Sequence, residues 1–232
     1  MRQDSEGVFA LNTDKFRYRL TYTKGEGVKY ISHLDFLRSI NRAFKRAKMP
    51  VAYSNGFNPH ILLNIALPCP VGVTSECEML DIELTHEMPT DEMTNLLNSV
   101  LMPDIRIVAA VRVKEEPDFS LISSALYDIT FKSETEFSIQ GFFDEESVII
   151  EKKSKRGMKE VNIKDFIKNI SLSYHDGTSY GISAELCAGG KANLKPELLI
   201  SAIEDFCKAK MHDIKIKREK IFFGQDLSEI NK

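Results

Sequence analysis

The sequence of 232 residues predicts an α+β protein made of two halves, the first with the ferredoxin-like order β-α-β-β-α-β. Two observations support this prediction. Strand-like stretches with alternating apolar and polar residues are interrupted twice among the first 116 residues by stretches with the apolar period of a helix. The segment Glu-Pro-Asp-Phe-Ser at 116–120 then separates this series from a second one, as an interdomain linker would.

The first half is predicted as a ferredoxin-like domain over residues 15–116. Its first strand lies within 16–31, where apolar residues alternate. The clearest helix follows at 32–49, and it starts at Ser32 with Asp35 three residues later, as in a capping box. We expect the apolar stripe of this helix to consist of Leu34, Leu37, Ile40, Phe44 and Ala47.

Two strands, a helix and a last strand complete the first half. In chain order we expect them at 61–67, 79–86, 89–101 and 104–116. The helix is expected to begin with Thr90 as its N-cap, directly after Pro89. These elements complete the β-α-β-β-α-β order.

The second half, 120–224, is predicted as another α+β domain. Its order of elements could make it a diverged second ferredoxin-like unit, although the two halves share no clear sequence repeat. The termini, 1–14 and 225–232, are expected to be loose. The expected elements are a strand at 125–131, a hairpin at 147–163, a short helix at 164–170, a hairpin at 171–187 turning at Asp176-Gly177, a helix within 189–207 and a strand at 214–223.

Composition excludes several classes of protein. The chain is 43% hydrophobic and 28% charged, as ordinary globular proteins are. It has no run of 18 apolar residues and no apolar leader at its start, so we expect a cytoplasmic protein with no membrane partner. The four cysteines have no metal-binding spacing and the five histidines are scattered. We therefore expect no metal, no cofactor in this chain, and buried thiols in place of disulfides.

Charge is unevenly distributed along the chain. Residues 15–49 carry ten Lys and Arg against two acids, whereas residues 76–92 carry seven acids and no Lys or Arg. Arg38, Arg42 and Arg46 are four residues apart and share one helix face, where like charges repel. Such a row can bind a phosphate backbone, pair with 76–92 inside the fold, or meet an acidic protein.

Two further basic clusters lie in the second half. The first is at the tip of the predicted hairpin, where it can contact phosphates or simply keep the loop soluble. It consists of Lys152, Lys153, Lys155, Arg156 and Lys159. The second lies on the last strand, where lysines can protect a sheet edge from pairing with another chain. It consists of Lys215, Lys217, Arg218 and Lys220.

Three short motifs occur together in the first half. They are Ser-His-Leu-Asp at 32–35, Gly-Phe-Asn-Pro-His at 56–60, and Leu-Pro-Cys-Pro-Val-Gly-Val-Thr-Ser at 67–75. This set resembles the bacterial radical-SAM-linked family, over roughly residues 15–200. The sequence departs from the family pattern after His60, where Ile61 and Leu62 replace a proline and a basic residue, and at Cys77, where glycine is usual. The Gly-Gly-Lys-Ala-Asn segment from 189 resembles the family's entry to its last helix.

The resemblance implies a partner and a setting. The partner would be a radical-SAM protein, which would carry the iron–sulfur cluster and S-adenosylmethionine. The family's association with a ribonuclease and with ribosomal proteins implies RNA modification or ribosome-related metabolism.

The first two motifs suggest a site. If 51–60 folds back on the helix start, His33, Asp35, Arg38, Asn58 and His60 could converge and form an acid/base pair or an anion pocket. Alternatively, Asp35 caps the helix while Asn58 and His60 satisfy loop backbone groups. Glu76, Glu78 and Asp81 are poor metal ligands, because Asp81 points to the opposite strand face.

Three functions fit these features. The one that we favour is a non-catalytic accessory protein of a radical-SAM enzyme that binds tRNA or rRNA, without preference for DNA. The second is an RNA-processing or RNA-modifying enzyme that uses His33, Asp35 and His60. The third is a docking module that presents 76–92 to a protein. The expected RNA- or anion-binding residues are Arg38, Arg42, Arg46, Asn58, His60, Lys153, Lys155 and Arg156.

Overall fold

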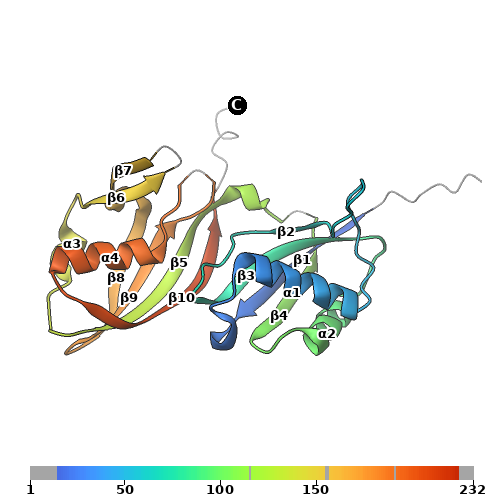
Figure 1. Cartoon of the computed structure of the whole chain (residues 1–232), viewed down its shortest axis with the longest axis horizontal. Helices are drawn as coiled ribbons and strands as arrows, with labels where there is room; N and C mark the ends of the chain where they lie inside the picture. The colour runs from blue at the N-terminus through green and yellow to red at the C-terminus, as the bar shows by residue number, and fades with distance from the viewer. Residues whose placement is uncertain (1–14, 115, 155–156, 191, 225–232) are drawn as a thin grey trace, which may run out of the picture.

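The structure is a computed structural model that describes residues 15–114, 116–154, 157–190 and 192–224. The termini that we expected to be loose, 1–14 and 225–232, lie outside the described residues. The described chain is mixed α+β, with four α-helices and one large sheet (Figure 1). None of its described helices has the length and apolar character needed to cross a membrane.

The first half has the expected order β-α-β-β-α-β, with β4 beside β1, β1 beside β3 and β3 beside β2. All three pairings are antiparallel, and nothing in them conflicts with a ferredoxin-like arrangement. The elements are β1 (Phe16–Lys24), α1 (His33–Arg46), β2 (Leu63–Ile65), β3 (Val73–Leu84), α2 (Thr90–Val100) and β4 (Ile105–Arg112).

The second half repeats this pairing order. If the separate hairpin β6–β7 is regarded as an insertion, β10 pairs with β5, β5 with β9 and β9 with β8, all antiparallel. The arrangement agrees with the expectation of a second unit of the same kind. The elements are β5 (Ile122–Ser133), α3 (Gln140–Asp144), β6 (Ile149–Ser154), β7 (Gly157–Asn162), β8 (Ile167–Asp176), β9 (Ser179–Cys187), α4 (Pro196–Cys207) and β10 (Met211–Phe223).

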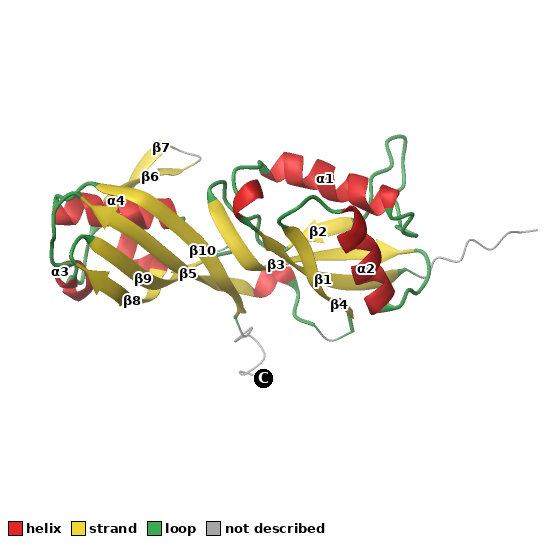
Figure 2. Cartoon of the chain, turned by 90° about the horizontal axis from the view of Figure 1, so that it is seen from below, coloured by secondary structure: helices red, strands yellow, loops and turns green. Residues whose placement is uncertain are grey.

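The two halves share one sheet. Val73–Ser75 of β3 pairs in parallel with Ile216–Arg218 of β10, which gives the order β4-β1-β3-β10-β5-β9-β8. The halves lie side by side along the longest axis of the molecule, and α1 and α4 are both in front of the sheet in Figure 1 (see also Figure 2). We call the contact between β3 and β10, with the loops above it, the seam.

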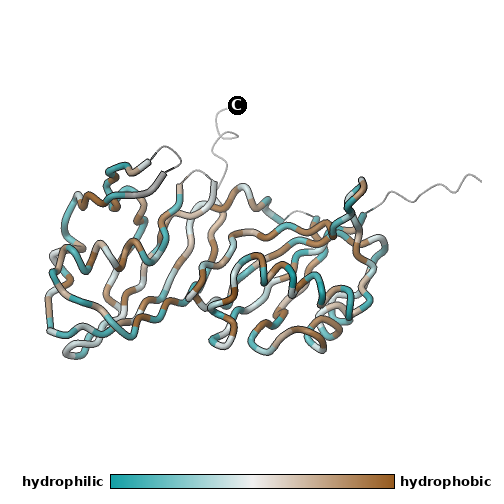
Figure 3. The backbone as a smooth tube through the Cα atoms, in the orientation of Figure 1, coloured by the Kyte–Doolittle hydropathy of each residue, from teal (hydrophilic) through white to brown (hydrophobic). Residues whose placement is uncertain are grey.

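Each half has its own hydrophobic core beneath its helices. In the first, Phe36 and Phe44 of α1 pack on the sheet, and the Phe36 ring stacks on Tyr22 with centroids 5.0 Å apart. In the second, Leu199 and Ile203 of α4 are buried against β5 and β9. Hydrophobic stretches follow the strands of both halves in Figure 3. Burying these side chains stabilises the fold by about 1.5–3 kcal/mol for each large residue.

The apolar stripe expected for α1 is partly wrong. Ile40 and Phe44 are buried as expected, but Leu34 is 61% exposed. Phe36 and Ala43 are buried instead. The buried stripe is therefore rotated about the axis of α1 relative to the expected one.

Four further details differ from the sequence-based expectations. The helix expected at 164–170 is a 3₁₀ turn, Ile163–Phe166, followed directly by β8. Pro89, not Thr90, occupies the N-cap position of α2. The strand expected at 79–86 begins at Val73, because its first residues pair with β10. For the same reason β10 is not an edge strand, and the edge-protecting role of its basic cluster is wrong.

Candidate functional site

The start of α1 is capped as the sequence predicts. The Ser32 hydroxyl accepts a hydrogen bond from the backbone N–H of Asp35 at 3.1 Å and donates one to its Oδ2 at 2.8 Å. Arg38 Nη1 donates to the other carboxylate oxygen at 2.9 Å. These contacts lower the pKa of Asp35, with the Ser32 hydrogen bond as the larger cause. Asp35 is therefore an ionised capping residue, which does not suit a catalytic acid.

The structure does not bring His60 to this place. The loop that carries Asn58 and His60 projects near the C-terminal end of α1, whereas His33 begins the helix (Figures 1 and 2). A helix of 14 residues is about 20 Å long, so the two ends are far apart. Ser54 binds both the backbone N–H and the ring of His60, at 3.1 and 2.8 Å. The expected convergence of His33 and His60 is therefore wrong. His60 instead hydrogen-bonds within its own loop, as in the alternative in which it satisfies loop groups.

His33 and His60 also line different cavities. His60 borders a cavity of about 340 Å³ that Arg17, Asp81 and Asp118 also line. His33 borders the cavity at the seam that is described below. An acid/base pair made from the two histidines is thus not present.

Acids of the segment 76–92 form ion pairs with residues of β1, β4 and β10 and with Lys15, and none of the described ion pairs joins this segment to α1. Its ion pairs are Glu76–Lys217 at 2.7 Å, Glu78–Arg218 at 2.8 Å, Asp81–Arg19 at 2.8 Å, Asp81–Arg17, Glu83–Lys15 at 3.2 Å and Glu87–Arg112. Within the described residues, no group of three or more His, Cys, Asp or Glu side chains could hold a metal ion. The acids that were considered as metal ligands, Glu76, Glu78 and Asp81, each bind a cation of the protein instead.

The arginines of α1 remain at the surface. Among the described residues, the ion pair of Arg38 is with Asp35 of its own helix, and Arg46 donates to the carbonyl of Val100 at 2.6 Å. Arg42 is exposed and has no ion pair with any described residue. We call the exposed set Arg38, Arg42, Lys45 and Arg46 the α1 cationic face.

A cavity of about 880 Å³ lies at the seam. Its walls are the start of α1 at His33, the loop 67–71, and the segments 189–190 and 192–198 that lead into α4. Tyr127 and Arg218 also line it. Two of the three family motifs and the glycine-rich segment therefore meet here, although they are up to 165 residues apart in the chain.

Arg218 is the residue of this site that sequence reasoning missed. Only 1% of it is exposed, and its Nη1 donates to Glu78 Oε1 and to the carbonyl of Leu67, both at 2.8 Å. Its Nε donates to the Tyr127 hydroxyl at 3.3 Å. Burial alone would lower the pKa of Arg218, but the Glu78 carboxylate raises it above its usual range. The side chain is a fixed cation.

The loop 67–71 is held in place by a hydrogen bond from Lys24 of β1. Lys24 Nζ donates to the carbonyls of Pro70 and Lys29, at 3.0 and 2.9 Å, and burial lowers the pKa of Lys24.

Burial raises the pKa of Cys69 to about 12 and that of Cys77 to about 11. All four cysteines are free and partly buried. A thiol that keeps its proton at neutral pH is a poor nucleophile, so Cys69 is structural.

The two glycines before α4 differ in whether the structure requires glycine at their positions. Gly189 has φ +106°, and a Cβ there would lie 2.3 Å from the Ile122 carbonyl oxygen, so no other residue fits. A Cβ on Gly190 would meet no atom within 4 Å. The space beside Gly190 is therefore open, and sterics do not require glycine there.

The basic hairpin tip is described only in part. Lys153 lies in β6, where its backbone pairs with Met158 of β7. Lys155 and Arg156 lie outside the described residues.

Fold and site together define an α+β protein of two similarly ordered units that share a sheet and enclose a cavity at their seam. The chain belongs to the family described as an uncharacterized protein conserved in bacteria, DUF2344, whose model matches residues 17–196. No curated protein matches it. One solved structure, titled "Crystal Structure of an Unknown Protein from Galdieria sulphuraria", is 10% identical and covers 88% of this chain and 99% of its own. Its TM-score with this chain is 0.26.

Proposed function

We propose that this protein is a non-catalytic accessory of a radical-SAM enzyme and that it binds single-stranded regions of tRNA or rRNA through the α1 cationic face. One observation carries the proposal. Five acids of the segment 76–92 bind cations on β1, β4 and β10 or on the segment before β1, and Arg42 and Lys45 of α1 have no ion pair with any described residue.

The α1 cationic face suits a phosphate backbone. It carries four cations, and the only acid on the helix is Asp35, at its first turn. Like charges four residues apart destabilise a helix by a few tenths of a kcal/mol. That repulsion is relieved when each cation neutralises a phosphate, and the released counterions favour binding further.

The radical-SAM partner rests on the motif resemblance. The chain has four cysteines at positions 69, 77, 187 and 207, a spacing that does not form a cluster-binding triad. The iron–sulfur cluster and S-adenosylmethionine would therefore belong to the partner. We expect the two proteins to elute together in gel filtration after coexpression.

The two other functions have less support. An enzyme built on His33, Asp35 and His60 would need groups that lie in different places, one of them an ionised cap. A docking surface on 76–92 would have to use acids that already bind cations within the fold.

The test compares two double variants with the same charge change. Arg42→Glu with Lys45→Glu alters the α1 cationic face at two residues that have no ion pair with the described chain. Lys208→Glu with Lys210→Glu makes the same change at the exposed end of α4. Binding of a labelled single-stranded oligoribonucleotide is measured by fluorescence anisotropy at several salt concentrations.

We expect only the α1 variant to lose affinity. Its slope of log K against log salt should become shallower by about 1.4, because each phosphate contact on a single strand contributes about 0.7. Unfolding curves check that both variants are folded. If the α1 variant binds RNA like the wild type at physiological salt, the proposal is wrong.

A further inference from the structure

We propose that the cavity at the seam binds one nucleotide of the RNA, with the base inside and the phosphate at the rim near Lys195. This inference rests on the proposed function for the source of the nucleotide. The site itself is argued from the position, size and chemistry of the cavity.

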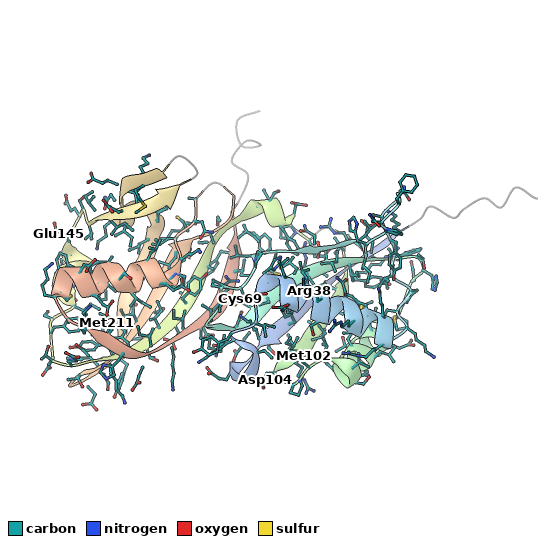
Figure 4. All side chains as sticks on the ribbon, viewed as in Figure 1. Arg38, Cys69, Met102, Asp104, Glu145 and Met211 are labelled. Atoms are coloured by element: carbon teal, nitrogen blue, oxygen red, sulfur yellow. The ribbon has the colours of Figure 1, made fainter. Side chains whose placement is uncertain are left out.

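The cavity lies where a strand held by α1 would arrive. The α1 cationic face begins at Arg38, and His33, one and a half turns before it, lines the cavity. Figure 4 shows Arg38 on α1 and Cys69, a residue of the cavity wall, beside the N-terminal half of the same helix. A strand that follows the exposed face of α1 towards its start therefore reaches the opening.

The size and walls of the cavity fit a nucleobase. Its volume of about 880 Å³ lies in the range of small-molecule pockets, about 300–1,000 Å³. Pro68, Val71 and Leu198 give it apolar walls. Tyr30, 73% exposed, lies next to the loop 67–71, since its ring is 3.8 Å from the place of a Cβ on Gly72. An exposed aromatic ring beside a basic helix is a stacking platform for a neighbouring base.

The floor of the cavity is polar and held in place. Arg218 and Tyr127 line it, and Glu78 together with the Leu67 carbonyl fixes the guanidinium. Hydrogen-bonding groups that are already oriented bind a base edge at a low entropic cost.

The rim can take the phosphate. Lys195, at the N-cap position of α4, is exposed and lines the cavity, and no side chain caps this 12-residue helix. Lys195 supplies a cation at this helix start, where Pro196 has no N–H to donate and the exposed Glu197 also lines the cavity, so the lysine is the group that would hold the phosphate. Gly190 leaves the space that the ribose and phosphate need, because no atom lies within 4 Å of its Cβ position.

The test uses AMP, GMP, CMP, UMP and inorganic phosphate as probes, with isothermal titration calorimetry of the full chain. Gly190→Trp places a large side chain beside the opening, at a position where a Cβ meets no atom within 4 Å. Ser201→Trp, on the exposed side of α4, is the matched control. We expect at least one nucleotide to bind the wild type, Gly190→Trp to weaken it about tenfold or more, and Ser201→Trp to leave it unchanged.

Two further arms separate this inference from the proposed function. Arg42→Glu with Lys45→Glu should lose oligoribonucleotide affinity and keep nucleotide binding, whereas Gly190→Trp should lose nucleotide binding and keep the salt slope. If no nucleotide binds and Gly190→Trp binds the oligoribonucleotide like the wild type, the inference is overturned and the α1 result stands.

Two other outcomes would also overturn it. Inorganic phosphate that binds as tightly as every nucleotide would show that the base is not read. Loss of the radical-SAM partner from Gly190→Trp, with no nucleotide bound by the wild type, would assign the cavity to a protein contact instead.

Discussion

Removing Glu78 should destabilise the seam strongly. Glu78 is fully buried and Arg218 is 1% exposed, so Glu78→Leu leaves a guanidinium in the interior without its counter-charge. Breaking a buried ion pair from one side costs about 3–5 kcal/mol. For a chain of this size that corresponds to a melting temperature lower by about 10 °C.

The neighbouring surface pair is the control. Glu76 and Lys217 lie on the same two strands at 2.7 Å, but their side chains are 60% and 36% exposed, so Glu76→Leu should cost about 1 kcal/mol or less. The double variant Glu78→Leu with Arg218→Met should lose less than Glu78→Leu alone, because neither charge is then left unpaired.

Urea unfolding followed by circular dichroism measures these free energies. The chain has no tryptophan, so the backbone signal is the direct probe. The reasoning fails if Glu78→Leu costs no more than Glu76→Leu. It also fails if the loss of the double variant equals the losses of Glu78→Leu and Arg218→Met added together, since additive losses would mean that the two charges are not coupled.

Three other measurements test the structure. Ser32→Ala removes the cap of α1 and should lower the free energy of unfolding by about 1 kcal/mol in urea; an unchanged midpoint would contradict the cap. Cys69, with its pKa raised by burial from 9.0 to about 12, should react with iodoacetamide at pH 8 about a thousandfold more slowly than an unperturbed thiol, as followed by mass spectrometry. Because the folded thiol keeps its proton to higher pH than the unfolded one, its contribution to stability should decrease as the pH rises above about 9. Gly189→Ala should cost about 2–3 kcal/mol and Gly190→Ala about 0.5 kcal/mol or less, and equal losses in thermal unfolding would contradict the assignment of the two glycines.

The order of elements could be predicted because it depends on local patterns. The capped start of α1, the turn at Gly177 with φ +57°, and Pro196 in the first turn of α4 all follow from residues close in the chain. The start of β3 could not be predicted in this way. Its first residue, Val73, pairs with Ile216, which is 143 residues away in the chain, so local patterns do not indicate where the strand begins.

The candidate site shows the same division. The motifs at 32–35 and 67–75 and the glycine-rich segment from 189 were recognisable as unusual, but nothing local shows that they share a cavity. The motif at 56–60 looked equally important and lies elsewhere. The sequence places Arg218 in a basic cluster with Lys217 and Lys220, a pattern typical of exposed residues, and nothing local indicates that its side chain is buried.

The sequence by itself determined α1, α2 and α4, most strands and the excess of positive charge on α1, since periodicity and capping act over a few residues, whereas α3 was not expected and the helix expected at 164–170 is a 3₁₀ turn. Only the tertiary structure decided which charges stay free. Sheet register sets Arg19 opposite Asp81 and Arg17 opposite Glu83, and the seam sets Arg218 beside Glu78. An ion pair depends on distance in space, which the chain fixes only after residues far apart in sequence have been brought together.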